Sequence, residues 1–265
     1  MHTTIHTNHH YAKISLQYKV FFSKHTSSTR TRPAGHDNLK WVPTTSTLIY
    51  RAKDAILVDA QLTSDAGHNI THIYITHAHG DHFFGSALIL KRFPDAVLVA
   101  IPEVEILFPN QIPQTLKVAR PLSRDYFKLE GEKLEVIRTG HIDTDNTTTL
   151  WVLSIKLAVT GDAVYVNTHL YLGESGMAAK RSEWINALDK IAALGPEHVV
   201  GGHSDPSMGF GPEAIYETKT YLENVEKISS NAGTAEELYE RVLEIYPERL
   251  NPGSLWAGAV LIKRP

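Results

Sequence analysis

The first half of the chain alternates hydrophobic and polar residues in short runs, which predicts β-strands separated by turns. The alternation is clearest around Leu16, Tyr18 and Val20, and a period of two is typical of a strand with one buried face. A continuous apolar run, Ile73-Tyr74-Ile75, indicates a fully buried strand. The predicted strands of this half are 11–22, 46–51, 55–59, 71–76 and 96–101, and we expect the second and third to form a hairpin.

Helical spacing becomes frequent in the second half. Trp184, Leu188 and Ile191 fall on one face of a helix predicted over 181–194, which Gly195-Pro196 ends. Thr234 begins another helix with an N-terminal capping signature. The predicted helices of the whole chain are 85–93, 102–108, 181–194, 212–229 and 234–245, and the later strands are 133–138, 147–153, 156–160 and 199–200, the middle two forming a hairpin.

Strands followed by a helix occur twice, and no linker rich in Gly, Ser or charge separates the two halves. This order predicts one domain spanning 1–265, in which helices cover the outer faces of two packed sheets. We expect residues 1–10 to be a mobile terminus and 212–265 to be a helical part of the same domain.

Composition narrows the functional classes. The chain of 265 residues has a formal charge of −3, so no basic excess indicates a nucleic-acid partner. No apolar run approaches the roughly 18 residues of a membrane-spanning helix. There is no cysteine, which excludes disulfides, thiolate catalysis and Cys-ligated zinc. We expect a cytoplasmic protein that acts on a small molecule, and a homodimer stays open.

The histidines are the unusual feature, with 15 in the chain. The segment Thr76-His77-Ala78-His79-Gly80-Asp81-His82 directly follows the buried strand 71–76. In an extended segment alternate side chains point the same way, so His77, His79 and Asp81 can face one cavity. His82 begins the next helix and points elsewhere, which suits a second, nearby point. Imidazoles with a carboxylate are the donors that zinc prefers.

Three later donors have the same setting, each just beyond a β segment and directly after a glycine. They are His141, Asp162 and His203. A glycine lets the backbone come close to an ion. Each Gly-His or Gly-Asp pair alone is weak evidence, but together with the first cluster they predict a metal site.

These motifs resemble the metallo-β-lactamase superfamily over about residues 45–205. The resemblance implies an α+β fold, the four-layer αββα sandwich, with the metals at the edge where the sheets meet. It implies that one ion is held by His77, His79 and His141, and that Asp162 bridges to a second ion held by Asp81, His82 and His203. Asp59, at the end of its strand, resembles the buried aspartate that supports the first histidine of the family motif.

The resemblance implies two divalent ions per chain, expected to be zinc, with manganese and iron as alternatives. Two such ions carry four positive charges, of which the carboxylates of Asp81 and Asp162 neutralise two. Water held between the ions therefore becomes far more acidic. The resulting hydroxide attacks a carbonyl that one ion polarises. We therefore predict a hydrolase in which Asp81 and Asp162 also take part in catalysis.

The segments 161–172 and 184–204 resemble a branch of small-molecule hydrolases from bacteria and filamentous fungi. Fungal members of such a branch open cyclic amides, so the predicted reaction is the opening of a small cyclic amide or ester. The segment Phe83-Phe84 is expected to form an apolar wall beside the metals, and the predicted substrate contacts are Phe83, Tyr165, His169 and Tyr171.

Two alternatives stay open. One is a thioester hydrolase of the glyoxalase II type, although 211–265 lacks the dense Lys/Arg cluster that glutathione carboxylates require. The segment after His141 also departs from the pattern of many relatives, which disfavours this type and the classical antibiotic-cleaving enzymes. The other alternative is a non-catalytic metal-binding protein that retains the fold.

Overall fold

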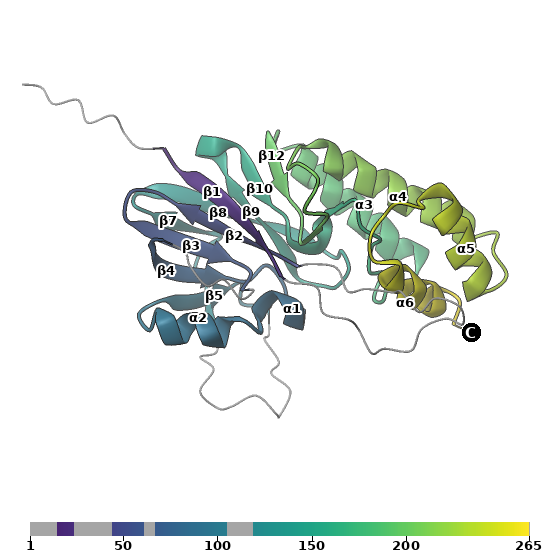
Figure 1. The fold of residues 1–265 in the computed structure, drawn as a ribbon, viewed down its shortest axis with the longest axis horizontal. Helices are drawn as coiled ribbons and strands as arrows, with labels where there is room; N and C mark the ends of the chain where they lie inside the picture. The colour runs from purple at the N-terminus through teal and green to yellow at the C-terminus, as the bar shows by residue number, and fades with distance from the viewer. Residues whose placement is uncertain (1–14, 24–43, 61–66, 105–118, 265) are drawn as a thin grey trace, which may run out of the picture.

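The computed structural model describes residues 15–23, 44–60, 67–104 and 119–264, and it contains two large β-sheets (Figure 1). The six-stranded sheet has the order β1-β2-β3-β4-β5-β6, and the five-stranded sheet has the order β12-β10-β9-β8-β7. The first sheet comprises β1 (Gln17–Phe22), β2 (Thr45–Tyr50), β3 (Asp54–Val58), β4 (Asn69–Tyr74), β5 (Val97–Ala100) and β6 (Arg120–Pro121).

The second sheet comprises β7 (Tyr126–Leu129), β8 (Glu132–Gly140), β9 (Thr147–Val152), β10 (Leu157–Val159) and β12 (His198–Val200). A short parallel pair joins β11 (Tyr165–Val166) to β13 (His203–Ser204), with Tyr165 opposite His203. This pair brings together two stretches of chain that follow β10 and β12, and both stretches contribute to the site described below.

Helices lie on both outer sides of the sheets. Figure 1 shows α1 (Gly80–Phe83) and α2 (Ser86–Arg92) beside the first sheet, and the later helices together beyond the second. These later helices are α3 (Ala178–Ala192), α4 (Glu213–Ser229), α5 (Ala235–Ile245) and α6 (Pro252–Ile262). The arrangement agrees with the predicted α+β sandwich. Among the residues described, no helix combines the length and the hydropathy that crossing a membrane would need.

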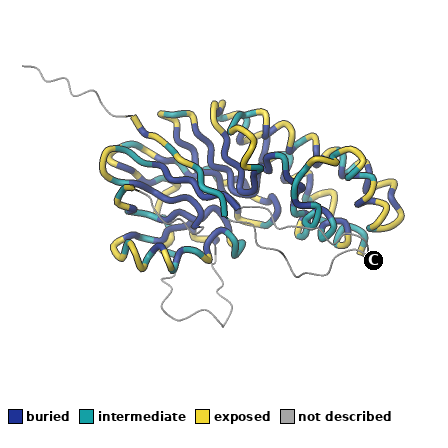
Figure 2. Tube along the Cα trace, in the orientation of Figure 1, coloured by how far each residue is buried: buried dark blue, intermediate teal, exposed yellow. Residues whose placement is uncertain are grey.

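The five-stranded sheet is buried on both faces because it lies between the other sheet and the helices. Along β9, Leu150 packs into the core between the sheets, whereas its neighbour Trp151 packs into the core under the helices with Trp184 and Tyr221. Every residue of β9 is buried, as the dark trace in Figure 2 illustrates for these strands. Burial on two faces explains why β9 has no polar alternation.

Most predicted elements of the described chain are confirmed. β2 and β3 pair antiparallel, as do β9 and β10, and the Thr234 hydroxyl caps α5 by accepting a hydrogen bond from the Glu237 backbone N–H at 3.2 Å. Residues 102–104 form a turn rather than the start of a helix. Three predictions lie partly or wholly outside the described residues: the mobile terminus 1–10, strand positions 11–14 and helix positions 105–108.

Sequence patterns missed β7 and α6 for identifiable reasons. β7 has only four residues, Tyr-Phe-Lys-Leu, too few for a reliable period. α6 is apolar almost all round, so no amphipathic stripe marks it, yet Leu255 and Ala259 bury against the other helices.

Candidate metal centre

The His-rich segment predicted as the site connects β4 to α1 at the end of the first sheet. The rings of His77 and His82 are fully buried, while the side chains of His79 and Asp81 keep 23% and 28% of their exposure. The segment therefore presents two groups to the interior and two partly to the surface.

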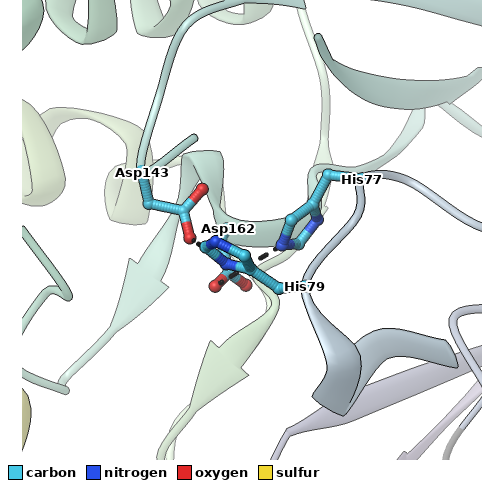
Figure 3. A group of neighbouring side chains, drawn as sticks. All are labelled: His77, His79, Asp143 and Asp162. Atoms are coloured by element: carbon cyan, nitrogen blue, oxygen red, sulfur yellow. Dashed lines mark ion pairs between the residues drawn. The ribbon is translucent and has the colours of Figure 1, made fainter. Parts of the chain in front are cut away.

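Four side chains from three separate stretches converge on a first point, as Figure 3 shows. They belong to His77, His79, Asp143 and Asp162, and one ligand atom of each lies within 4.8 Å of those of the others. His79 Nδ1 is 2.9 Å from Asp143 Oδ2, and His77 Nε2 is 4.0 Å from Asp162 Oδ2. Histidine nitrogens thus face carboxylate oxygens across a small space.

A second point adjoins the first and is formed by Asp81, His82 and His203. His203 Nε2 is 3.4 Å from Asp81 Oδ2, and His82 Nε2 is 3.9 Å from the same oxygen. Asp162 reaches this point too, because its Oδ1 is 3.1 Å from His82 Nε2 and its Oδ2 is 3.3 Å from His203 Nε2. Asp162 therefore lies between the two points.

Hydrogen bonds behind the rings orient two of these histidines. Asp59 accepts from His82 Nδ1 at 2.9 Å, so the lone pair of His82 lies on Nε2, which faces the second point. The Thr76 hydroxyl donates to Asp59 at 2.9 Å and therefore accepts from His77 Nδ1, also at 2.9 Å. Asp59 thus supports His82 directly and the first histidine only through Thr76, a residue that sequence reasoning missed.

Glu174 orients the ring of His79. Its Oε1 is 3.2 Å from His79 Nε2 and holds that side of the ring, while His79 Nδ1 faces Asp143. Its Oε2 accepts from the Thr144 hydroxyl at 2.7 Å, so the carboxylate joins the His79 ring to the loop that carries Asp143. Sequence reasoning missed Glu174 because no motif marks it.

The donor set fits divalent ions. Several buried ligand atoms at both points have no hydrogen-bond partner: His77 Nε2, His82 Nε2, both carboxylate oxygens of Asp143, and Asp162 Oδ1. Buried polar atoms are rarely left unpaired. Two ligands about 2.1 Å from one tetrahedral zinc ion are about 3.4 Å apart, close to the spacing of several nitrogen–oxygen pairs at these points.

The electrostatics also favour positive charge here. Burial, and after it the charge of Asp162, raise the pKa of the Asp143 carboxyl to about 6. Burial opposes ionisation of Asp162 as well, but His203 and His82 outweigh burial and hold its pKa well below the usual range. Burial lowers the pKa of His77, which makes its ring a neutral donor. Although burial opposes it, the neighbouring carboxylates raise the pKa of His79 to about 11 and that of His203 to about 10, so these buried carboxylates favour positive charge at the site.

Two of the glycines before the later donors are required by space. A Cβ on Gly202 would lie 2.0 Å from Asp162 Oδ1, and a Cβ on Gly161 would lie 2.6 Å from the Thr76 hydroxyl oxygen. Gly161 also has a φ of +52°, which side chains other than glycine rarely adopt. The backbone therefore approaches the ligands as closely as the sequence pattern predicts.

One predicted ligand is not brought to either point. His141 is buried at the end of β8, but Nδ1 is 2.7 Å from Asp145 Oδ1 and Nε2 is 2.8 Å from the Ser175 hydroxyl. Asp143, which sequence reasoning did not single out, joins the first point instead. Sequence reasoning selected donors that directly follow a glycine, so it selected His141 and passed over Asp143.

The predicted substrate contacts are placed differently from one another. Tyr165 and His169 are fully buried: the Tyr165 hydroxyl donates to Asp162 at 2.9 Å, and His169 Nδ1 bonds the Tyr221 hydroxyl at 2.9 Å. Phe83 is buried as well, so none of the three offers surface to a bound molecule. Tyr171 is partly exposed, with its ring centre 6.0 Å from that of His79.

The apolar wall expected beside the metals belongs to Phe84, whose residue is 54% exposed. A Cβ on Gly80 would lie 2.4 Å from the Phe84 ring, so the ring covers the backbone between His79 and Asp81.

Comparison with known proteins agrees with this geometry. The family model described as the metallo-beta-lactamase superfamily matches residues 39–203, more than half of the chain. The chain belongs to the metallo-β-lactamase superfamily. The matched range contains every ligand of both points. No curated protein matches this sequence significantly.

Solved structures with a similar fold include metallo-β-lactamases. A metallo-β-lactamase from Pontibacter korlensis is 17% identical with a TM-score of 0.57, covering 79% of this chain and 95% of that one. The DIM-1 enzyme is 16% identical with a TM-score of 0.60, covering 80% and 97%. FIM-1 from Pseudomonas aeruginosa, solved in a mono-zinc form, is 18% identical with a TM-score of 0.55, covering 77% and 95%. At this identity the likeness shows the fold of the superfamily.

Proposed function

We propose that this protein is a binuclear zinc hydrolase that opens a small, uncharged cyclic amide or ester. The observation that carries the proposal is the pair of adjoining donor groups, joined by Asp162 and open to the surface at His79 and Asp81. Zinc bound at these points would supply the Lewis acidity that lets water attack a carbonyl at neutral pH. The chain's own residues then position the ions and the substrate.

Within this proposal each carboxylate has a separate task. Asp162 is buried and fixed by the Tyr165 hydroxyl, so it spaces the two donor groups. Asp81 is the more exposed carboxylate and accepts a hydrogen bond from the Thr44 hydroxyl at 3.1 Å. Because Asp81 is partly exposed, it is the group that can pass a proton between the site and solvent.

The exposed side chains beside His79 support an uncharged substrate. Phe84 is half exposed, Tyr171 lies against His79, and the side chain of Glu174 is 53% exposed beside them. Two aromatic rings favour an apolar or heteroaromatic ring, and the Glu174 carboxylate disfavours substrates that carry their own carboxylate. These features support a lactam or lactone over a glutathione thioester, in line with the resemblance to small-molecule hydrolases.

A substrate panel tests the proposal. Zinc-loaded protein is assayed with neutral lactones, neutral lactams, carboxylate-bearing β-lactams and a glutathione thioester. We expect turnover of a neutral lactone or lactam that chelator removes and zinc restores. His79→Ala should abolish turnover while circular dichroism shows a folded protein. Fully metallated protein that cleaves none of these bonds would contradict the proposal and favour a metal-binding role without catalysis.

A further inference from the structure

Arg181 is the only arginine or lysine that is buried within the described part of the chain. It lies in the first turn of α3, which contains no acidic residue, and a positive charge there lies at the positive end of the helix dipole. Burying a charge also costs free energy unless the charge is paired and hydrogen-bonded. Helix formation therefore does not explain an arginine at this position, whereas the contacts that it makes outside α3 do.

The guanidinium group of Arg181 joins a loop to α4. Its Nη1 donates to the Ser175 carbonyl oxygen at 2.9 Å and to the Gly176 carbonyl oxygen at 2.6 Å. Its Nε donates to Glu226 Oε2 at 2.8 Å, and Nη2 donates to the same oxygen. The Glu226 carboxylate thus balances the buried charge. Arg181 thereby fixes the backbone of residues 174–176, which we call the Glu174 segment, against α4.

The Glu174 segment touches two of the histidines that the superfamily pattern assigns to the first ion. Glu174 Oε1 is 3.2 Å from His79 Nε2, and Glu174 Oε2 accepts from the Thr144 hydroxyl at 2.7 Å. The Ser175 hydroxyl lies 2.8 Å from His141 Nε2. A displacement of this segment would therefore move the carboxylate that holds the His79 ring, together with its contacts to the loop between β8 and β9.

The end of α6 supports the Glu174 segment as well. A Cβ on Gly176 would lie 3.5 Å from the Leu261 carbonyl oxygen, which is van der Waals contact. Lys263, which follows α6, donates to the carbonyl oxygens of Ser229 and Ala232 at 2.5 and 2.6 Å and so fastens α6 to the end of α4. Van der Waals contact limits how far the segment can move, whereas the directional hydrogen bonds of the guanidinium set its orientation.

We propose that Arg181 is a positioning residue for the metal centre. By fastening the Glu174 segment to α4, its guanidinium sets the direction from which the Glu174 carboxylate holds the His79 ring. This inference rests on the metal centre of the proposed function and adds to it a residue of α3 whose hydrogen bonds go to no ligand. Removing a group that orients a ligating histidine weakens metal binding by about 10–100-fold. Because Arg181 acts through Glu174, we expect its removal to cause a loss at the lower end, about tenfold.

The zinc affinity of folded protein tests the proposal without any substrate. Arg181→Met keeps an unbranched apolar stem and removes the guanidinium, and Glu174→Ala removes the carboxylate that is held. Competition with a chromogenic chelator gives the affinity of each variant, and circular dichroism checks that it is folded. We expect Arg181→Met to bind one of the two ions about tenfold more weakly than wild type. The double variant should match Glu174→Ala, because both changes remove the same hold on His79, and losses that multiply would overturn the proposal.

The ion pair between Lys219 and Asp189 offers a matched control, because it joins the same two helices through Nζ and Oδ1 at 2.6 Å. Lys219→Met removes this pair and should leave the zinc affinity unchanged. If Lys219→Met weakens zinc binding as much as Arg181→Met does, the effect comes from the docking of α3 on α4 and the proposal fails.

Arg181→Lys is the second variant, and it decides the matter if Arg181→Met does not fold. An ammonium keeps the charge beside Glu226 but cannot reproduce the planar fork of a guanidinium, so we expect a zinc affinity between those of wild type and Glu174→Ala. Wild-type affinity in folded Arg181→Met, or in Arg181→Lys where only that variant folds, would overturn the proposal. Wild-type protein that binds no zinc would refute the proposed function together with this inference, whereas two ions in wild type and unchanged variants would refute the inference alone.

Discussion

Replacing Thr76 by valine removes one hydroxyl that joins Asp59 to His77 at the back of the metal centre. The hydroxyl lies 2.9 Å from Asp59 Oδ2 and 2.9 Å from His77 Nδ1, and the residue is fully buried. Valine has nearly the same shape, so the change leaves little cavity. What it removes is the acceptor for the His77 N–H and a donor to a carboxylate.

The size of the effect follows from those two contacts. A hydrogen bond to a charged group contributes about 1.5–3 kcal/mol, and a buried donor left without a partner costs about 1–3 kcal/mol. Because such contributions are not additive, we expect the free energy of unfolding of metal-free protein to fall by about 3 kcal/mol. Loss of the group that orients a ligating histidine should weaken zinc binding by about 10–100-fold.

Urea unfolding in chelator measures the first effect, and competition with a chromogenic chelator measures the second. Thr149→Val is the matched control, because the buried hydroxyl of Thr149 has no hydrogen-bond partner. That variant should unfold at or above the urea concentration of wild type and bind zinc normally. If Thr76→Val behaves like Thr149→Val in both assays, the hydroxyl does not orient His77 and this reasoning fails.

Other predictions concern backbone space and a buried histidine. Gly202→Ala places a Cβ 2.0 Å from Asp162 Oδ1 and should lower bound zinc to one ion per chain or fewer. In the control variant Gly209→Ala the new Cβ meets nothing within 4 Å, so this variant should keep two ions. Equal metal contents in the two variants would contradict the spatial argument. Burial, and after it the positive charge of Arg249, lower the pKa of His169 to about 3. The unfolded chain therefore binds a proton that the folded chain does not between pH 6.5 and 3, so stability should fall with decreasing pH by up to about 1.4 kcal/mol per unit in that window. His169→Gln, which does not titrate, should show a shallower fall in chemical unfolding measured across those pH values, and identical slopes would exclude His169 as the cause.

Much of the centre was predictable from sequence because its ligands follow local rules. The His77 to His82 segment directly follows a buried strand, so alternation places His77 and His79 on one side, while Asp81 and His82 lie in α1. Asp162 and His203 follow strands of the other sheet, and glycine marks the close approach at each. These signals depend only on residues next to one another in the chain.

The remaining features depend on contacts between distant segments. The place of Asp143 depends on a bulge in β8 and on Glu174, which lies beyond β9 and β10. Burial of Tyr165 follows from the pairing of β11 with β13, which sets its ring 5.2 Å from that of His203. A substrate role inferred from sequence position alone could not anticipate that Tyr165 would bond a ligand from behind.

The central claim is that these separated side chains form one centre for two divalent ions. Calorimetric titration of Zn²⁺ into metal-free wild-type protein, with metal analysis of the product, tests it most directly. The account predicts two ions bound per chain, with both bound ions lost on treatment with chelator. Protein that stays folded and binds no zinc under saturating conditions would contradict it.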